Sequence, residues 1–68
     1  MIKFTTINVD GIEITRELTF KEFEADWFSE DCSLPMCNDA VVFAEIDGEK
    51  IEAKIFKDVV AYIIAIYY

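Results

Sequence analysis

The 68-residue sequence predicts a small α+β domain with elements in the order ββαβββ. One helix is expected to pack on one face of an antiparallel-rich sheet. Two Asp-Gly pairs between alternating apolar residues predict hairpins, and a preference for Ile and Val over Leu favours strands. A capped stretch with apolar residues at helical spacing predicts the helix. The length suits one domain, residues 1–68.

Two hairpins are expected at Asp10-Gly11 and Asp47-Gly48. Asp-Gly suits a type I′ turn because both central residues of that turn adopt positive φ. The flanking alternation predicts strands at 2–9 and 12–18, and again at 40–46 and 49–56. In the second hairpin Glu45 is expected opposite Lys50, which would be a favourable cross-strand pair.

A short helix is expected between the hairpins. Thr19 and Glu22 have the spacing of a capping box, in which each side chain accepts a hydrogen bond from the other's backbone amide. Phe20, Phe23 and Trp27 follow at i, i+3 and i+7, which forms one apolar stripe. Residues 29–39, which include Pro35, are predicted to be mainly loop.

The C-terminal segment 59–68 is ambiguous between strand and helix. Its β-branched residues and tyrosines favour a strand that follows a turn at Lys57-Asp58. The alternative is a buried helix capped by Asp58. We predict the strand, although short apolar runs of this kind do not separate the two by periodicity alone.

The charge balance limits the classes of partner. Fourteen acidic residues face six basic ones, for a net charge of −8. Such a protein is expected to be repelled by nucleic acids and anionic membranes and attracted to basic proteins, unless the acidity serves solubility alone. The sequence shows no signal-peptide pattern, and its longest apolar run, 59–68, is too short to span a bilayer. We therefore expect a cytoplasmic location and reduced thiols.

The residue types argue against an enzyme and against a cofactor. Histidine is absent, and both glycines stand in the predicted turns, which leaves no Gly-rich loop for a phosphate. Cys32 and Cys37 would need two further ligands to hold a metal, for example from a second copy of the chain. We expect no metal and interpret both cysteines as packed loop residues.

A row of carboxylates is the first candidate binding surface. Glu22, Asp26 and Glu30 are spaced by four residues, and they share one face if the helix reaches Glu30, with Glu24 and Asp31 beside them. One interpretation is an ordinary solvated helix face. The other, which we adopt as a prediction, is a row of negative charge that mimics a phosphate backbone and docks in a basic groove.

An apolar sheet face is the second candidate. If 59–68 is a strand, a group of apolar side chains points away from the helix, and a single helix cannot cover both faces. This group predicts self-association into a homo-oligomer. Its members are Val41, Phe43, Val59, Ile63 and Tyr67. A helical C-terminus would instead bury its apolar residues and remove this interface.

Together these features predict a small acidic inhibitor that binds a basic host protein. Phage or mobile-element proteins that block nucleic-acid-binding defence enzymes have this size and charge, and the chain resembles anti-CRISPR, anti-restriction and uracil-glycosylase-inhibitor proteins in those two respects, with no matching motif. No direct binding of nucleic acid or membrane is expected. The alternative is a non-enzymatic interaction or self-assembly module that uses the apolar sheet face.

Overall fold

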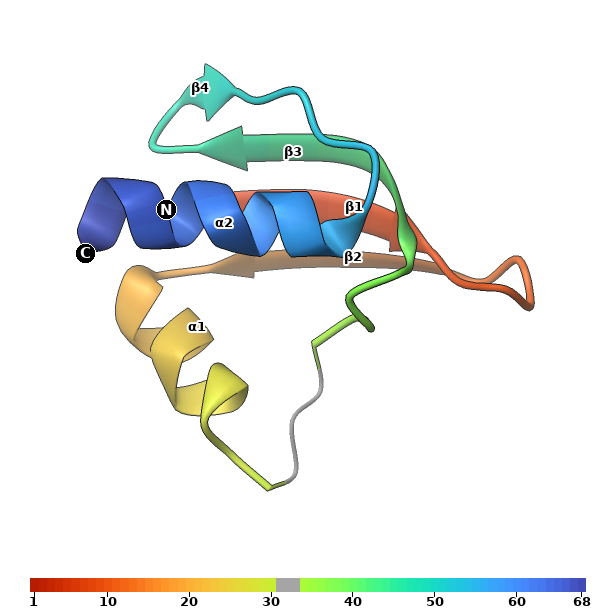
Figure 1. The fold of residues 1–68 in the computed structure, drawn as a ribbon, viewed down its shortest axis with the longest axis horizontal. Coiled ribbons are helices and arrows are strands. Elements are labelled where there is room, and N and C mark those ends of the chain that lie inside the picture. Colours follow the sequence, from red (N-terminus) through yellow and green to blue (C-terminus); the bar gives the residue numbers. More distant parts are fainter. Residues whose placement is uncertain (31–33) are drawn as a thin grey trace.

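The computed structural model describes residues 1–30 and 34–68 and has the predicted α+β class. Its elements are, in order, β1 (Ile2–Ile7), β2 (Glu13–Leu18), α1 (Phe20–Trp27), β3 (Ala40–Ile46), β4 (Glu49–Lys50) and α2 (Phe56–Tyr67), as Figure 1 shows. The four strands form one antiparallel sheet in the order β2-β1-β3-β4.

The first hairpin has a wider loop than the Asp-Gly pair alone predicts. The β1–β2 ladder ends at Ile7 and Glu13. The Oδ1 atom of Asn8 accepts hydrogen bonds from the backbone amides of Asp10 and Ile12, at 2.9 and 3.0 Å. Because the side chain of Asn8 takes these amides, the strands stop short of the predicted bounds 2–9 and 12–18.

The second hairpin has the predicted two-residue turn. Asp47 and Gly48 both have positive φ, 52° and 86°. Glu45 lies opposite Lys50, which confirms the expected pair. The strand predicted at 49–56 is wrong beyond Lys50, because the chain then follows β3 only through scattered contacts, including an isolated bridge between Ala40 and Ile55.

The strand predicted at 59–68 is wrong, since Phe56–Tyr67 is the helix α2 and the order is therefore ββαββα. Phe56, Val59, Val60 and Ile63 stand at i, i+3, i+4 and i+7, and all four are buried. Packing of this stripe against the sheet overrides the strand preference of β-branched residues, which is a weak tendency by comparison.

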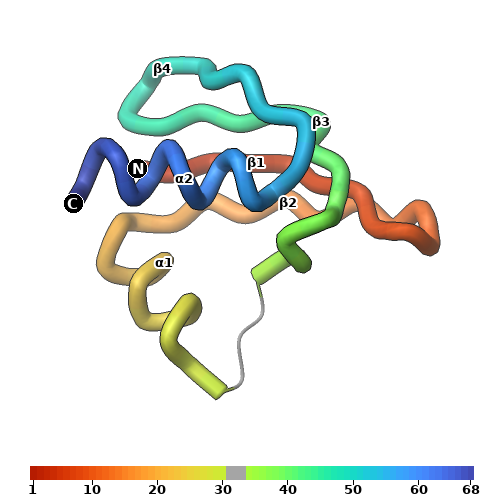
Figure 2. The backbone as a smooth tube through the Cα atoms, viewed as in Figure 1, coloured from red at the N-terminus to blue at the C-terminus, as the bar shows by residue number. Residues whose placement is uncertain are grey.

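α2 lies across one face of the sheet (Figures 1 and 2), and the buried apolar side chains lie between them. Ile2 and Phe4 of β1 are fully buried beneath the helix, and the ring of Phe4 lies 5.0 Å from that of Phe56. Ala44 and Ile46 of β3 complete this layer. One helix thus covers one face of the sheet as predicted, but it is α2 and not α1.

The opposite face of the sheet carries charge. A register row of four residues crosses all four strands with alternating sign. It consists of Glu17, Lys3, Glu45 and Lys50. Neighbours of opposite sign on adjacent strands stabilise a sheet modestly and keep its face in water. This face is therefore polar, where the sequence predicted an apolar one.

The predicted oligomer interface is therefore wrong, because its five residues do not lie on one exposed sheet face. Val59 and Ile63 are 0% exposed in the core, because α2 turns them toward the sheet. Val41 and Tyr67 also pack against the core. Phe43 pairs with Thr5 on the opposite face and is half-buried. These five residues do not form one exposed surface.

Neither helix among the described residues combines the length and apolar character that a membrane span requires.

Candidate protein-binding site

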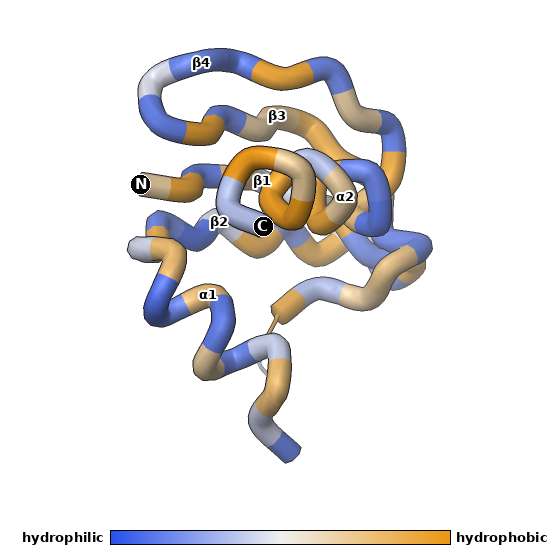
Figure 3. Tube along the Cα trace, turned by 60° about the vertical axis from the view of Figure 1, so that its left-hand side comes forward, coloured by the Kyte–Doolittle hydropathy of each residue, from blue (hydrophilic) through white to orange (hydrophobic). Residues whose placement is uncertain are grey.

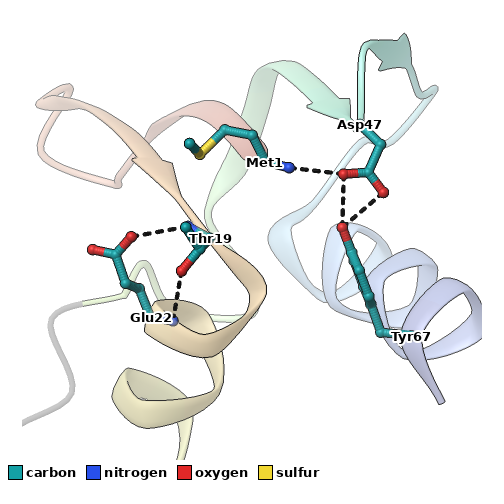
Figure 4. Close-up of polar contacts among 5 residues, drawn as sticks. All are labelled: Met1, Thr19, Glu22, Asp47 and Tyr67. Atoms are coloured by element: carbon teal, nitrogen blue, oxygen red, sulfur yellow. Dashed lines mark hydrogen bonds and ion pairs between the residues drawn. The ribbon is translucent and has the colours of Figure 1, made fainter.

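The capping box at the start of α1 holds the first of the predicted carboxylates. The backbone amide of Glu22 donates to Oγ1 of Thr19, and the backbone amide of Thr19 donates to Oε1 of Glu22, both at 3.1 Å. Figure 4 shows this reciprocal pair, which confirms the predicted cap. The bond from the Thr19 backbone lowers the pKa of the Glu22 carboxyl, so Glu22 is charged and fixed at the helix start.

Two further carboxylates of α1 have partners from other elements. Arg16 of β2 donates from Nη2 to Oδ2 of Asp26 at 3.2 Å. The hydroxyl of Tyr68, just after α2, donates to Glu24, and this bond raises the pKa of Tyr68. The helix therefore carries its acids in fixed positions, and both partners come from outside α1.

Glu30 lies outside the helix. α1 ends at Trp27: the amide of Phe28 makes the last i→i−4 bond, to the carbonyl of Glu24, and the amide of Ser29 donates instead to Asp26, an i→i−3 bond that tightens the last turn. The row Glu22, Asp26 and Glu30 is therefore not one helix face, although Glu30 is exposed. Asp31, the fifth predicted residue, lies outside the described residues.

Aromatic contacts hold α1 against α2. The ring of Phe20 stacks on Tyr67 with centroids 4.4 Å apart, and it meets the ring of Tyr68 edge-on at 5.5 Å. Phe23 stacks on Trp27 at 5.9 Å. In Figure 2 α1 lies beside the C-terminal end of α2, away from the centre of the sheet. The contacts of Phe20 with Tyr67 and Tyr68 thus join the two helices at the C-terminal end of α2, whereas the stack of Phe23 on Trp27 lies within α1.

A pocket of about 120 Å³ remains between the two helices. Among the described residues, Glu24 is its one charged lining residue. Its apolar walls are Phe20, Phe23, Trp27 and Phe28 on the α1 side and Val60, Ile64 and Tyr68 on the α2 side. A second apolar hollow shares Trp27, Val60 and Ile64 and continues toward Cys37 and Lys57. We call the two hollows together the interhelix groove.

The walls of the interhelix groove are open to water. Trp27 is 37% exposed, Ile64 47%, Tyr68 72% and Phe28 75%. Figure 3 shows hydrophobic residues on successive turns of α2, with paler residues between them. Large apolar residues outside the buried stripe of a helix indicate a further contact, and that excess is the sequence signal for this site. Sequence reasoning did not single out Phe28, which follows the predicted apolar stripe of the first helix, and it missed Ile64 and Tyr68 because it treated 59–68 as a strand.

Cys37 is exposed, and Cys32 lies outside the described residues. The described part of the chain contains no group of three or more His, Cys, Asp or Glu residues arranged to hold a metal ion.

No protein-family model, curated protein or solved structure matches the chain.

Proposed function

We propose that this protein is a non-catalytic inhibitor that docks on a basic protein surface through α1. The observation that carries the proposal is the placement of Glu22, Glu24 and Asp26 on one eight-residue helix beside exposed aromatic side chains. Hydrogen bonds within the chain hold these three carboxylates in place. A surface that is ordered before binding loses less entropy on association.

A nucleic-acid enzyme is the target class that this proposal favours. Clefts that bind DNA or RNA are rich in Lys and Arg, and a net charge of −8 speeds the encounter with such a cleft through long-range attraction. The inhibitor would then be of the anti-CRISPR or anti-restriction type, encoded by a phage or mobile element and active in the host cytoplasm. Its contact with the enzyme would exclude the nucleic acid.

Self-assembly is a second candidate, favoured by the outer face of α2. Tyr62 and Ile66 are 43% and 51% exposed there, and Ala61 and Ala65 lie beside Tyr62. Small residues four positions apart let a second helix approach closely. This face replaces the sheet face that the sequence predicted as the site of self-association.

The test removes charge from α1 and from Glu30 just beyond it, while keeping the hydrogen bonds of α1. The variant carries Glu22→Gln, Glu24→Gln, Asp26→Asn and Glu30→Gln. Glutamine at the third helical position still completes a capping box, and the asparagine amide oxygen that replaces the Asp26 carboxylate would still accept from Arg16. At low salt the wild-type protein is expected to retain basic nucleic-acid enzymes from a host extract, and the variant is expected not to retain them. Wild-type retention is expected to fall as salt rises, because exposed charges are screened beyond about 8 Å at physiological ionic strength.

The matched control removes the same number of charges elsewhere. Glu13→Gln, Glu17→Gln, Glu49→Gln and Glu52→Gln all change exposed residues away from α1. This control is expected to retain the captured enzyme, and the purified enzyme is expected to lose nucleic-acid binding when wild-type protein is added. If both variants lost enzyme retention equally, retention would depend on net charge and not on the position of the charges. Salt-independent self-association without a captured enzyme would favour the second candidate.

A further inference from the structure

We infer that the interhelix groove receives a large apolar side chain from the partner, and that Lys or Arg residues flank this side chain in the partner's sequence. The inference rests on the proposed function, because it takes the partner to be basic. It adds a specific contact to a surface that charge alone would leave unselective.

The size and chemistry of the pocket fit one such side chain. Its volume of about 120 Å³ approaches that of an engineered apolar cavity of about 150 Å³ that binds benzene. Rings of Phe23 and Trp27 form one wall, and Ile64 forms part of the other. A Phe, Leu or Ile side chain inserted here would remove apolar surface from water on both partners.

The charges around the groove select the flanking residues. Among the described residues, Glu24 is the one charged residue that lines the pocket, so the α1 wall carries a negative charge there. Lys57 lies at the opposite end, in the second hollow. Cationic residues beside the inserted side chain would therefore pair with α1. A second copy of this chain is a poorer occupant, because each copy carries a net charge of −8.

A tryptophan in the groove allows binding to be followed by fluorescence. Trp27 is the single tryptophan of the chain, and its side chain lines both hollows. Because 37% of it is exposed, insertion of an apolar side chain beside it would exclude water and shift its fluorescence to shorter wavelength.

The experiment titrates the protein with three synthetic helical peptides and follows Trp27 emission. The first peptide places Phe and Leu on one face among Lys residues. The second replaces Phe and Leu by Ala, and the third replaces Lys by Glu. We expect only the first to bind measurably and to shift the emission. All three peptides lack Trp and Tyr, so the signal comes from the protein.

Two matched variants locate the binding. Ile64→Ser changes a wall of the groove, whereas Ile66→Ser changes an equally exposed isoleucine of α2 outside it. Ile64→Ser is expected to weaken binding of the first peptide at least about tenfold, and Ile66→Ser less than about twofold. Circular dichroism of both variants checks that α2 is retained.

The outcomes separate this inference from the proposed function. If the Lys/Ala peptide binds as tightly as the first, docking by charge survives and the groove inference is overturned. If the Glu peptide binds equally and Ile64→Ser weakens both, the groove is used but the basic partner is wrong. An emission shift that follows protein concentration without peptide would identify a second copy as the occupant and overturn the inference. Absence of binding by all three peptides would also overturn it.

Discussion

Both the inner and the outer side of α2 carry large apolar side chains, but their surroundings are opposite. Phe56, Val59 and Ile63 on the inner face are 0% exposed, whereas Ile64 and Ile66 on the outer side are about half-exposed. The sheet offers one apolar face, and one stripe of the helix fills it. The remaining apolar side chains exceed what the core of one chain needs. That surplus, rather than hydrophobicity itself, is what marks a contact surface.

The largest expected effect comes from truncating neighbouring isoleucines on the two faces. Ile63→Ala leaves a cavity beneath α2 and is expected to lower the free energy of unfolding by about 2–5 kcal/mol. Ile64→Ala removes a half-exposed side chain and is expected to cost less than about 1 kcal/mol. Urea unfolding followed by circular dichroism measures both.

Similar losses in these two alanine variants would contradict the distinction between the faces. They would mean that Ile64 is covered in solution, by a second copy or another segment. Repeating the unfolding at several protein concentrations would identify a second copy, because the stability of a dimer depends on concentration.

Local rules explain which parts of the fold the sequence could predict. The Asp47-Gly48 turn, the pair Glu45 and Lys50, and the capping box of Thr19 each depend on residues close together in sequence. The state of 59–68 does not, because the sheet that buries Val59 and Ile63 is built from distant segments. Local preference for strand was overruled by that packing.

The candidate site was predictable to a similar extent. Capping-box spacing identified Glu22, and helical spacing placed Asp26 on the same helix. The partners Arg16 and Tyr68 come from other elements, and no local pattern indicates them. The groove itself depends on α2 being a helix, so the strand prediction concealed it. The residues that line the groove come from both helices, so they could be identified only from the packing of α1 against α2.

An intermediate effect is expected at adjacent threonines on opposite faces of β1. Thr6 is 0% exposed on the covered face, and its Oγ1 has no hydrogen-bond partner within the described residues. Thr6→Val keeps the shape and removes the unpaired hydroxyl, which is expected to raise the free energy of unfolding by about 1 kcal/mol. Urea unfolding measures the gain.

Thr5 provides the matched control for this change. Its Oγ1 lies 2.9 Å from Oγ1 of Thr15 on the polar face. Thr5→Val breaks that hydrogen bond and buries nothing, so no gain in stability is expected. A loss of stability in Thr6→Val would show that the hydroxyl has a partner and that the covered face is not wholly apolar.

The smallest expected effect lies at Tyr67, near the C-terminal end of α2. Its hydroxyl donates to both carboxylate oxygens of Asp47, at 2.8 and 2.7 Å, and the amino group of Met1 donates to the same carboxylate at 2.7 Å, as Figure 4 shows. The Met1 hydrogen bond, then the Tyr67 bond, lower the pKa of Asp47, and the bond to Asp47 raises the pKa of Tyr67. These contacts link α2 to the turn between β3 and β4.

The two pKa shifts set a pH window for this link. A lowered carboxyl pKa contributes stability above its unfolded value, near pH 4, and the contribution is lost as pH falls through the folded pKa. A raised tyrosine pKa contributes stability below its unfolded value, near pH 10, and the contribution is lost as pH rises through the folded pKa. Tyr67→Phe is therefore expected to lower the thermal midpoint slightly at neutral pH.

Comparison of variants across pH isolates the ionic part of the link. The deficit of Tyr67→Phe relative to wild type is expected to shrink as the pH falls from about 4 toward the lowered pKa of Asp47, and to vanish once Asp47 is protonated. Asp47→Asn retains a residue that tolerates positive φ in the turn, and it is expected to flatten the acid limb of the wild-type profile. If Tyr67→Phe showed no deficit at any pH, the role of Tyr67 would be assigned to its stacking on Phe20, because phenylalanine keeps the ring. The aromatic contact between the helices, and not the hydroxyl, would then hold α2 at this end.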